Sequence, residues 1–260
     1  MRPPLPPPSF QMPTPATVNR LQRLAGGLAA ALLVGSTGAP ATAAPTRDAG
    51  GLGVPAAQQL AILNHDTGAF ATPGPDSRRE TELSDARPIT GERTVLPVLA
   101  SATGPRGLHW LEVLLPGRPN SHTGWIQQRA TTQSSTHWQI TVSLSARTVT
   151  VFYAGLAVKT FSAVVGKPTT PTPTGSFFVE ENVTLTPAQS GAPYALALSA
   201  RSNALQEFDG GPGQTALHGI ANIGGIPGTA VSHGCVRLTT ADITWLAARI
   251  TPGVPVTITQ

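Results

Sequence analysis

Two short segments near the end of the chain combine the residue types that nucleophilic catalysis needs. The first is the dipeptide His218-Gly219, and the second, thirteen residues further on, is Ser-His-Gly-Cys-Val-Arg at residues 232–237. The cysteine of this second segment, Cys235, is the only one in the chain. A thiol attacks efficiently only when it loses its proton, and an imidazole within hydrogen-bonding reach can accept that proton. The two segments therefore predict a Cys–His nucleophile assembled from distant parts of the chain.

We expect His218 to be the base, because it comes from a separate segment and can approach the sulfur from the side. Its second ring nitrogen needs an orienting partner, and neither segment contains an Asp or Glu, so the carbonyl of Gly219 is the expected partner. The turn at Gly234 and Cys235 is expected to present backbone amides to a developing oxyanion, since glycine lets a backbone approach closely. For the side chain of His233, a role in the reaction and a packed structural role both remain open.

Alternating apolar residues predict that β-strands position these groups. Ile140, Val142 and Leu144 alternate with Thr and Ser, which is the pattern of a strand with one buried face. One helix is expected after Thr240, and Pro252 should end it. Further strands are expected over residues 149–152, 158–165, 175–179, 194–199 and 215–217. Residues 135–260 are therefore predicted to form a mainly β domain, a β-sandwich with one short helix.

A smaller β-module is predicted over residues 93–134. Three short β-type runs, at residues 95–100, 109–115 and 124–127, are separated by Gly-Pro and Pro-Gly-Arg-Pro-Asn turns. This segment resembles bacterial SH3-like modules, and either a wall-binding role or a plain structural subdomain fits it. Because it contains no candidate nucleophile or base, we expect it to affect targeting or substrate access more than chemistry.

The N-terminal segment has the pattern of a secretory signal peptide. Two arginines precede an apolar run at residues 24–34, and Ala-Thr-Ala follows at residues 41–43, which predicts a signal over residues 1–43 with cleavage after Ala43. The run is too short to span a membrane, which takes about 20 residues, although a buried helix or an uncleaved anchor stays an alternative. Residues 44–92 are predicted to be a flexible linker, with a helical turn as an option at Gln58–Leu63.

The charge pattern argues against a nucleic-acid partner. The formal net charge is +4, but Arg2, Arg20 and Arg23 lie in the predicted signal, and the remainder carries a net charge of only +1 with no basic run. Binding that neutralises phosphates needs a basic surface. The single cysteine also cannot form an internal disulfide, so in an oxidising compartment it must be buried or used.

The quoted segments resemble a known family. His218-Gly219 followed by the hexapeptide at residues 232–237 is similar to the signature of the L,D-transpeptidase catalytic domain, the YkuD-type fold. Gly-Lys-Pro-Thr-Thr-Pro-Thr-Pro-Thr-Gly-Ser-Phe at residues 166–177 is similar to a loop of that family, and Gly-Gly-Pro-Gly at residues 210–213 also fits it. The resemblance covers residues 138–260. Ile220 departs from the Thr that is common after the His-Gly pair, which concerns only local hydrogen bonding.

The resemblance implies a role for each residue of the two segments. Cys235 would be the nucleophile, His218 would accept and return the proton, and the carbonyl of Gly219 would orient it. Backbone amides of His233, Gly234 and Cys235 would form the oxyanion hole.

The resemblance also implies a substrate. Arg237 and Ser232 would contact the donor, a tetrapeptide stem of peptidoglycan whose terminal D-Ala leaves as a thioester forms. An amine of a neighbouring stem would then resolve the thioester into a cross-link. We expect an exported monomer in the cell wall or periplasm that needs no cofactor or metal and is trapped by carbapenems.

Three other functions are consistent with parts of the sequence. Water as the acceptor would make the protein an L,D-carboxypeptidase. A zinc peptidase could use His218, His233 and Cys235 as ligands, although the usual ligand spacings and a carboxylate base are missing. A non-catalytic wall-binding protein would need neither Cys235 nor His218.

Overall fold

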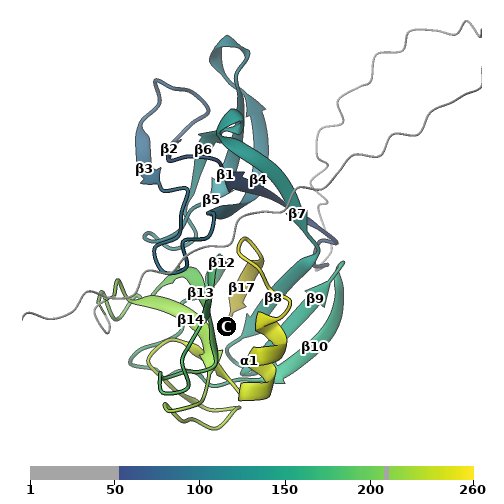
Figure 1. Ribbon diagram of the computed structural model, residues 1–260, viewed down its shortest axis with the longest axis vertical. Coiled ribbons are helices and arrows are strands. Elements are labelled where there is room, and N and C mark those ends of the chain that lie inside the picture. Colours follow the sequence, from purple (N-terminus) through teal and green to yellow (C-terminus); the bar gives the residue numbers. More distant parts are fainter. Residues whose placement is uncertain (1–52, 208–210) are drawn as a thin grey trace, which may run out of the picture. The chain divides into compact units, whose positions relative to one another are not determined.

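The computed structural model describes residues 53–207 and 211–260 (Figure 1). The predicted signal peptide of residues 1–43 lies outside the described residues, as does the start of the predicted linker. Within the described ranges the fold is mainly β, as expected, with sheets of seven, eight and two strands and one α-helix. No helix in these ranges has the length and apolar character needed to cross a membrane.

The seven-stranded sheet forms the N-terminal module. Its strand order is β3-β2-β6-β5-β4-β1-β7, and every neighbouring pair is antiparallel. The strands are β1 (Gln58–Leu63), β2 (Thr67–Phe70), β3 (Arg79–Leu83), β4 (Val95–Thr103), β5 (His109–Leu114), β6 (Thr123–Gln127) and β7 (Thr131–Thr136). Two short 3₁₀ turns, η1 (Pro105–Gly107) and η2 (Gln128–Ala130), connect strands. The three β-type runs expected in this region are therefore present as β4, β5 and β6.

The flexible linker predicted over residues 44–92 is wrong where the structure describes it. Strands β1, β2 and β3 come from this segment, and β1 lies inside the sheet between β4 and β7, so Gln58–Leu63 is not a helical turn. Leu63, Ala69 and Leu83 of these strands are buried in the core of the module. Each strand is short, and the apolar residues of β1 follow one another without the alternation that marks a strand, so the sequence signal was weak. The module thus begins well before residue 93, and its likeness to SH3 modules stays a prediction.

The eight-stranded sheet forms the C-terminal domain, with the order β10-β9-β8-β17-β12-β13-β14-β16. Pairs β8–β17 and β14–β16 are parallel. The strands are β8 (Trp138–Ser143), β9 (Thr148–Tyr153), β10 (Leu156–Ser162), β12 (Gly175–Thr184), β13 (Tyr194–Arg201), β14 (Gln214–Gly219), β16 (Val236–Leu238) and β17 (Pro255–Thr259). A separate parallel pair joins β11 (Val165–Gly166) to β15 (Ala230–Ser232).

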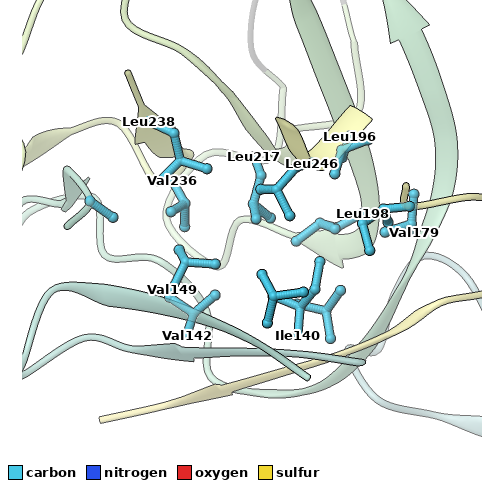
Figure 2. Close-up of a cluster of buried hydrophobic side chains, with 14 of the residues drawn as sticks. Ile140, Val142, Val149, Val179, Leu196, Leu198, Leu217, Val236, Leu238 and Leu246 are labelled. Atoms are coloured by element: carbon cyan, nitrogen blue, oxygen red, sulfur yellow. The ribbon is translucent and has the colours of Figure 1, made fainter. Parts of the chain in front are cut away.

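The two halves of this sheet face each other across one hydrophobic core. Figure 2 shows Val142 and Val149 of β8 and β9 opposite Val236 and Leu238 of β16, with side chains from β13, β14 and the helix beside them in the same core. The two layers of the expected sandwich therefore belong to one continuous, strongly bent sheet. This core fixes the positions of β14 and β16, the strands next to the candidate nucleophile and base.

Helix α1 (Thr240–Ala247) packs Ile243 and Leu246 into the same core. Its start is capped, because the Thr239 hydroxyl accepts a hydrogen bond from the Asp242 amide at 3.2 Å. The helix ends before Ile250, which is nevertheless fully buried, so the expected helical stripe is one turn shorter than predicted.

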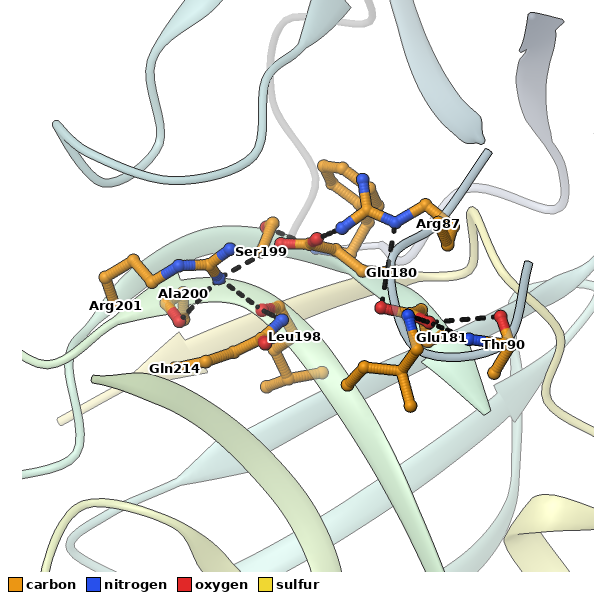
Figure 3. Close-up of polar contacts among 11 residues, drawn as sticks. Arg87, Thr90, Glu180, Glu181, Leu198, Ser199, Ala200, Arg201 and Gln214 are labelled. Carbon is orange, nitrogen blue, oxygen red and sulfur yellow. Dashed lines mark hydrogen bonds and ion pairs between the residues drawn. The ribbon is translucent and has the colours of Figure 1, made fainter. Parts of the chain in front are cut away.

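A buried cluster of charges connects the N-terminal module to the C-terminal domain. Glu180 and Glu181 of β12 have side chains that are 0% and 1% exposed. Figure 3 shows Arg87 of the module paired with both carboxylates and Arg201 of β13 paired with Glu180. The amide and hydroxyl of Thr90 also donate to Glu181. Isolated buried charges are very costly. The two carboxylates of the C-terminal domain therefore depend on Arg87 and Thr90 of the N-terminal module.

Burial also changes the pKa of Arg201, the arginine that the C-terminal domain contributes to this cluster. It lowers the pKa of Arg201 to about 10, a value at which the guanidinium is still charged near neutral pH. Phe178, next to these carboxylates in the chain, is 1% exposed and packs into the core of the N-terminal module. Phe178 therefore adds an apolar contact between the module and the domain to the ionic cluster.

We predict that Arg87→Ala lowers the free energy of unfolding by about 3 kcal/mol, because it leaves two buried carboxylates short of a cation. The matched control is Arg78→Ala, which removes a surface ion pair with Glu80 and should cost less than about 1 kcal/mol. Urea unfolding curves of the two variants give the comparison. Equal small losses would show that the cluster does not join the two parts.

Candidate active site

The parallel pairing of β14 with β16 brings the two predicted segments together. Leu217 pairs with Val236, and His218 pairs with Arg237. Leu217 and Val236 point into the core, and side chains alternate along a strand. His218, Arg237 and Cys235, which precedes Val236, therefore lie on the opposite face of the sheet.

These side chains line one cavity. Of the predicted residues, His218, His233, Gly234, Cys235 and Arg237 all contribute to its lining. The rest of the lining comes from Ile223 and from the segment that follows β13 and enters β14, namely Ser202, Leu205, Gly213, Gln214 and Thr215. The structure thus assembles the candidate nucleophile and base around one opening, although they lie seventeen positions apart in the sequence.

The imidazole of His218 is held in one tautomer. The side chain is buried, with 8% of the residue exposed, and Nδ1 lies 2.7 Å from the carbonyl oxygen of Gly219. A carbonyl can only accept a hydrogen bond, so Nδ1 carries the proton and Nε2 has the free lone pair. This is the contact expected for the Gly219 carbonyl.

Gly191 is a site residue that the sequence reasoning missed. It lies in the connection between β12 and β13 with φ of +87°, and a Cβ atom there would come within 2.5 Å of His218 Nδ1. Its carbonyl accepts the Gly219 amide at 2.7 Å, and its own amide donates to Ala221 at 2.8 Å. Glycine is needed both for the positive φ and for the close approach of the ring. The only sequence signal was an isolated Gly in a loop, far from either motif.

The surroundings of both reacting groups shift their pKa values towards the neutral forms. Burial raises the pKa of the Cys235 thiol, against smaller lowering effects of a hydrogen bond from the Ala216 backbone and the charge of Arg237. Burial likewise lowers the pKa of His218 below its usual value, and the Arg237 charge adds to this, while the bond to Gly219 acts in the opposite direction. Both shifts favour a pair in which the thiol holds its proton until the imidazole accepts it.

The turn before the nucleophile is built by Ser232. This residue is fully buried, and its hydroxyl donates to the Cys235 carbonyl at 2.6 Å and accepts from the Gly234 amide at 3.1 Å. The expected contact of Ser232 with substrate is thus replaced by a structural role. The Gly234 amide donates to this hydroxyl, which conflicts with the oxyanion-hole role expected for it.

The loop that resembles the family's Pro-Thr-Pro segment packs against this turn. The Lys167 amide donates to the Ser232 carbonyl at 3.0 Å, and the Thr170 hydroxyl donates to it at 3.2 Å. Lys167 Nζ lies 3.4 Å from Nε2 of His233. An ammonium can only donate, so in this contact Nε2 of His233 is the acceptor.

Arg237 has a structural contact in addition to its place in the cavity. The residue is 6% exposed, and its guanidinium donates to the carbonyls of Ile223 and Gly224 at 3.4 and 3.2 Å. Its Nε has no hydrogen-bond partner in the described part of the chain. Arg237 thus holds the loop after β14 and keeps a positive charge beside Cys235.

The zinc alternative finds no support in the geometry. In residues 53–207 and 211–260, no group of three or more His, Cys, Asp or Glu side chains is close enough to hold a metal ion. His218, His233 and Cys235 line the same cavity but do not converge on one point as ligands would.

Comparison with known proteins identifies the family. Residues 137–258 match the family model "L,D-transpeptidase catalytic domain". YkuD of Bacillus subtilis is 30% identical over 148 residues, which cover 57% of this chain and 74% of that protein. L,D-transpeptidase 1 of Mycobacterium tuberculosis is 30% identical over 128 residues, which cover 45% of this chain and 48% of that protein. The chain belongs to the L,D-transpeptidase family.

Among solved structures, L,D-transpeptidase 3 of Mycobacterium tuberculosis with a faropenem-derived adduct is 18% identical with a TM-score of 0.41. The match covers 64% of this chain and 91% of that one. The C442S mutant of the Enterococcus faecium L,D-transpeptidase is 24% identical with a TM-score of 0.35, and the match covers 47% of this chain. This chain spans about half the length of the Enterococcus faecium protein and of L,D-transpeptidase 1.

We predict that Gly191→Ala displaces the His218 ring and slows alkylation of Cys235 by about tenfold to a hundredfold, the scale expected for a misplaced reacting group. Gly228→Ala is the matched control, because Gly228 also has a positive φ but has nothing within 4 Å of an added Cβ. Both variants should lose about 1 kcal/mol of stability through backbone strain. Similar alkylation rates in the two variants would show that Gly191 does not position the ring.

Proposed function

We propose that the protein is an exported L,D-transpeptidase that cross-links peptidoglycan stem peptides through a thioester on Cys235. The observation that carries this proposal is the His218 imidazole, buried and fixed in the Nδ1–H tautomer by Gly219, in the same cavity as the thiol. Such an arrangement suits acyl transfer, because a base oriented on one nitrogen presents the other to the nucleophile. Family membership supplies the class of reaction.

In the first half-reaction, Nε2 of His218 accepts the thiol proton as the sulfur attacks the carbonyl carbon before the terminal D-Ala. The carbonyl oxygen becomes an oxyanion, for which the backbone amides of His233 and Cys235 are the proposed donors. The C–N bond then breaks, the imidazolium gives its proton to the amine of D-Ala, and the acyl group remains on the sulfur as a thioester.

In the second half-reaction, an acceptor amine attacks the thioester and loses its proton to His218. The C–S bond breaks, and the sulfur recovers a proton from the imidazolium. Water in place of the amine would give the L,D-carboxypeptidase alternative through the same thioester. The amine is our choice because transfer is the reaction that names the family.

Two further parts of the proposal concern the substrate and the location. The positive charge of Arg237, which lines the same cavity as Cys235, supports binding of a donor stem that carries carboxylates. Action on peptidoglycan requires a place outside the cytoplasm, for which we propose residues 1–43 as the signal. A non-catalytic wall-binding role would give no reason for a base and a thiol to share a cavity.

Intact-protein mass spectrometry with a donor tetrapeptide tests the proposal. We predict an adduct of the tripeptide acyl group on Cys235 together with one released D-Ala, and no adduct in Cys235→Ser. A carbapenem should give the corresponding acyl adduct. D-Ala release that persists in Cys235→Ser, or that is lost on chelation and restored by zinc, would contradict the covalent mechanism.

A further inference from the structure

One wall of the cavity is a loop that depends on the N-terminal module for its shape. The loop joins β13 to β14, and its Ser202, Leu205 and Gly213 line the cavity that contains Cys235. The Ser202 amide donates to the Gly213 carbonyl at 2.8 Å, which closes the base of the loop. Beyond this bond, the stabilising contacts described below come from the turn between β5 and β6.

Arg118 in that turn binds three carbonyls of the loop at once. Its Nη2 donates to Ser202 at 2.7 Å and to Leu205 at 3.2 Å, and its Nη1 donates to Pro212 at 3.0 Å. The acceptors lie in both arms of the loop, so the guanidinium bridges them. A planar fork of donors is suited to this task, whereas a lysine ammonium is a single point.

Asn120, in the same turn, uses its side chain to hydrogen-bond the backbone at the end of β13, as a neighbouring strand would. Its side-chain amide nitrogen donates to the Arg201 carbonyl at 2.7 Å, and its oxygen accepts from the Arg201 amide at 2.8 Å. This pair of bonds reproduces the two-way exchange of a β-ladder at the last residue of β13. The Gly117 amide also donates to the Ser199 carbonyl at 3.2 Å. The turn therefore fixes the chain where β13 leads into the cavity wall.

We propose that Arg118 is a positioning residue for acyl transfer, which holds the cavity wall of Ser202, Leu205 and Gly213 against the acyl donor, with Asn120 fixing the start of that wall. The inference rests on the proposed function, because it assigns the wall to the binding of that donor. It revises the expectation that the N-terminal module affects targeting or access more than chemistry. The module supplies no reacting group, but it shapes the site in which the groups react.

Two kinds of reagent differ in what they require of the site. Iodoacetamide is small and needs only the thiol and its base, whereas a tetrapeptide or a carbapenem must be held in a reactive geometry between the cavity walls. Loss of a positioning contact costs rate only for reactions that depend on such geometry. Arg118 should thus matter for acylation and not for alkylation.

The test compares Arg118→Ala and Arg118→Lys in the full mature chain. The matched control is Arg129→Ala. Arg129 is an exposed arginine of the same module, and in the described part of the chain its side chain bonds only to that of Gln127. For each protein, three quantities are measured: acylation by the tetrapeptide and by a carbapenem, alkylation by iodoacetamide, and hydrogen–deuterium exchange of residues 199–207 and 211–215. We expect Arg118→Ala to slow acylation by about tenfold or more and to raise exchange in the loop. Alkylation and its pH profile should stay at the wild-type values, Arg118→Lys should lie between, and Arg129→Ala should behave as the wild type.

The outcomes separate this inference from the proposed function. If the wild type forms no acyl adduct, the proposed function is overturned together with the positioning role. If the wild type is acylated and Arg118→Ala is acylated equally fast, only the positioning role is overturned, whatever the exchange shows. An increase in exchange across the whole chain, with alkylation and acylation reduced alike, would show a general structural role and would also overturn it.

Discussion

The parallel pairing of β14 with β16 is the constraint on which the site depends. With Leu217 opposite Val236 in the core, strand alternation sends His218, Cys235 and Arg237 to the other face. A shift of one residue would exchange the two faces and bury the imidazole among aliphatic side chains. The hydrophobic core beneath the strands, drawn in Figure 2, thus determines the chemistry above them. The turn that Ser232 closes then fixes where the thiol leaves the strand.

Two features determine the properties of this site: the burial of its reacting groups and the contacts between its wall and the N-terminal module. Burial raises the pKa of Cys235 and lowers that of His218, so both shifts favour a neutral thiol beside a neutral imidazole. On the side facing the N-terminal module, Glu180 is paired with Arg87 and Arg201, and the backbone of Arg201 is held by Asn120. The ionic cluster and the wall of the cavity therefore meet at Arg201.

The sequence was informative where a feature is local. The bond from His218 to Gly219 joins neighbouring residues, and the long alternating strands of the C-terminal domain were predicted in outline. Gly191 and Arg118 could not be found in this way, because each acts on a segment distant in the chain and neither lies in a motif. Strands β1 to β3 were missed because each is short, and the apolar residues of β1 follow one another instead of alternating with polar ones. Ser232 was assigned to substrate because its motif position says nothing about the direction of its hydroxyl.

The pH dependence of Cys235 alkylation in the wild type, His218→Ala and His233→Ala tests most directly the claim that His218 activates Cys235. Because the pKa of His218 is lowered, the wild type should keep its base-assisted rate as the pH falls through about 6.5, the usual histidine value, and lose it only below. His218→Ala should react appreciably only above the ordinary thiol pKa of about 8.5, while His233→Ala should follow the wild type. An unchanged profile in His218→Ala, with the alkaline shift in His233→Ala instead, would contradict the account and make His233 the base.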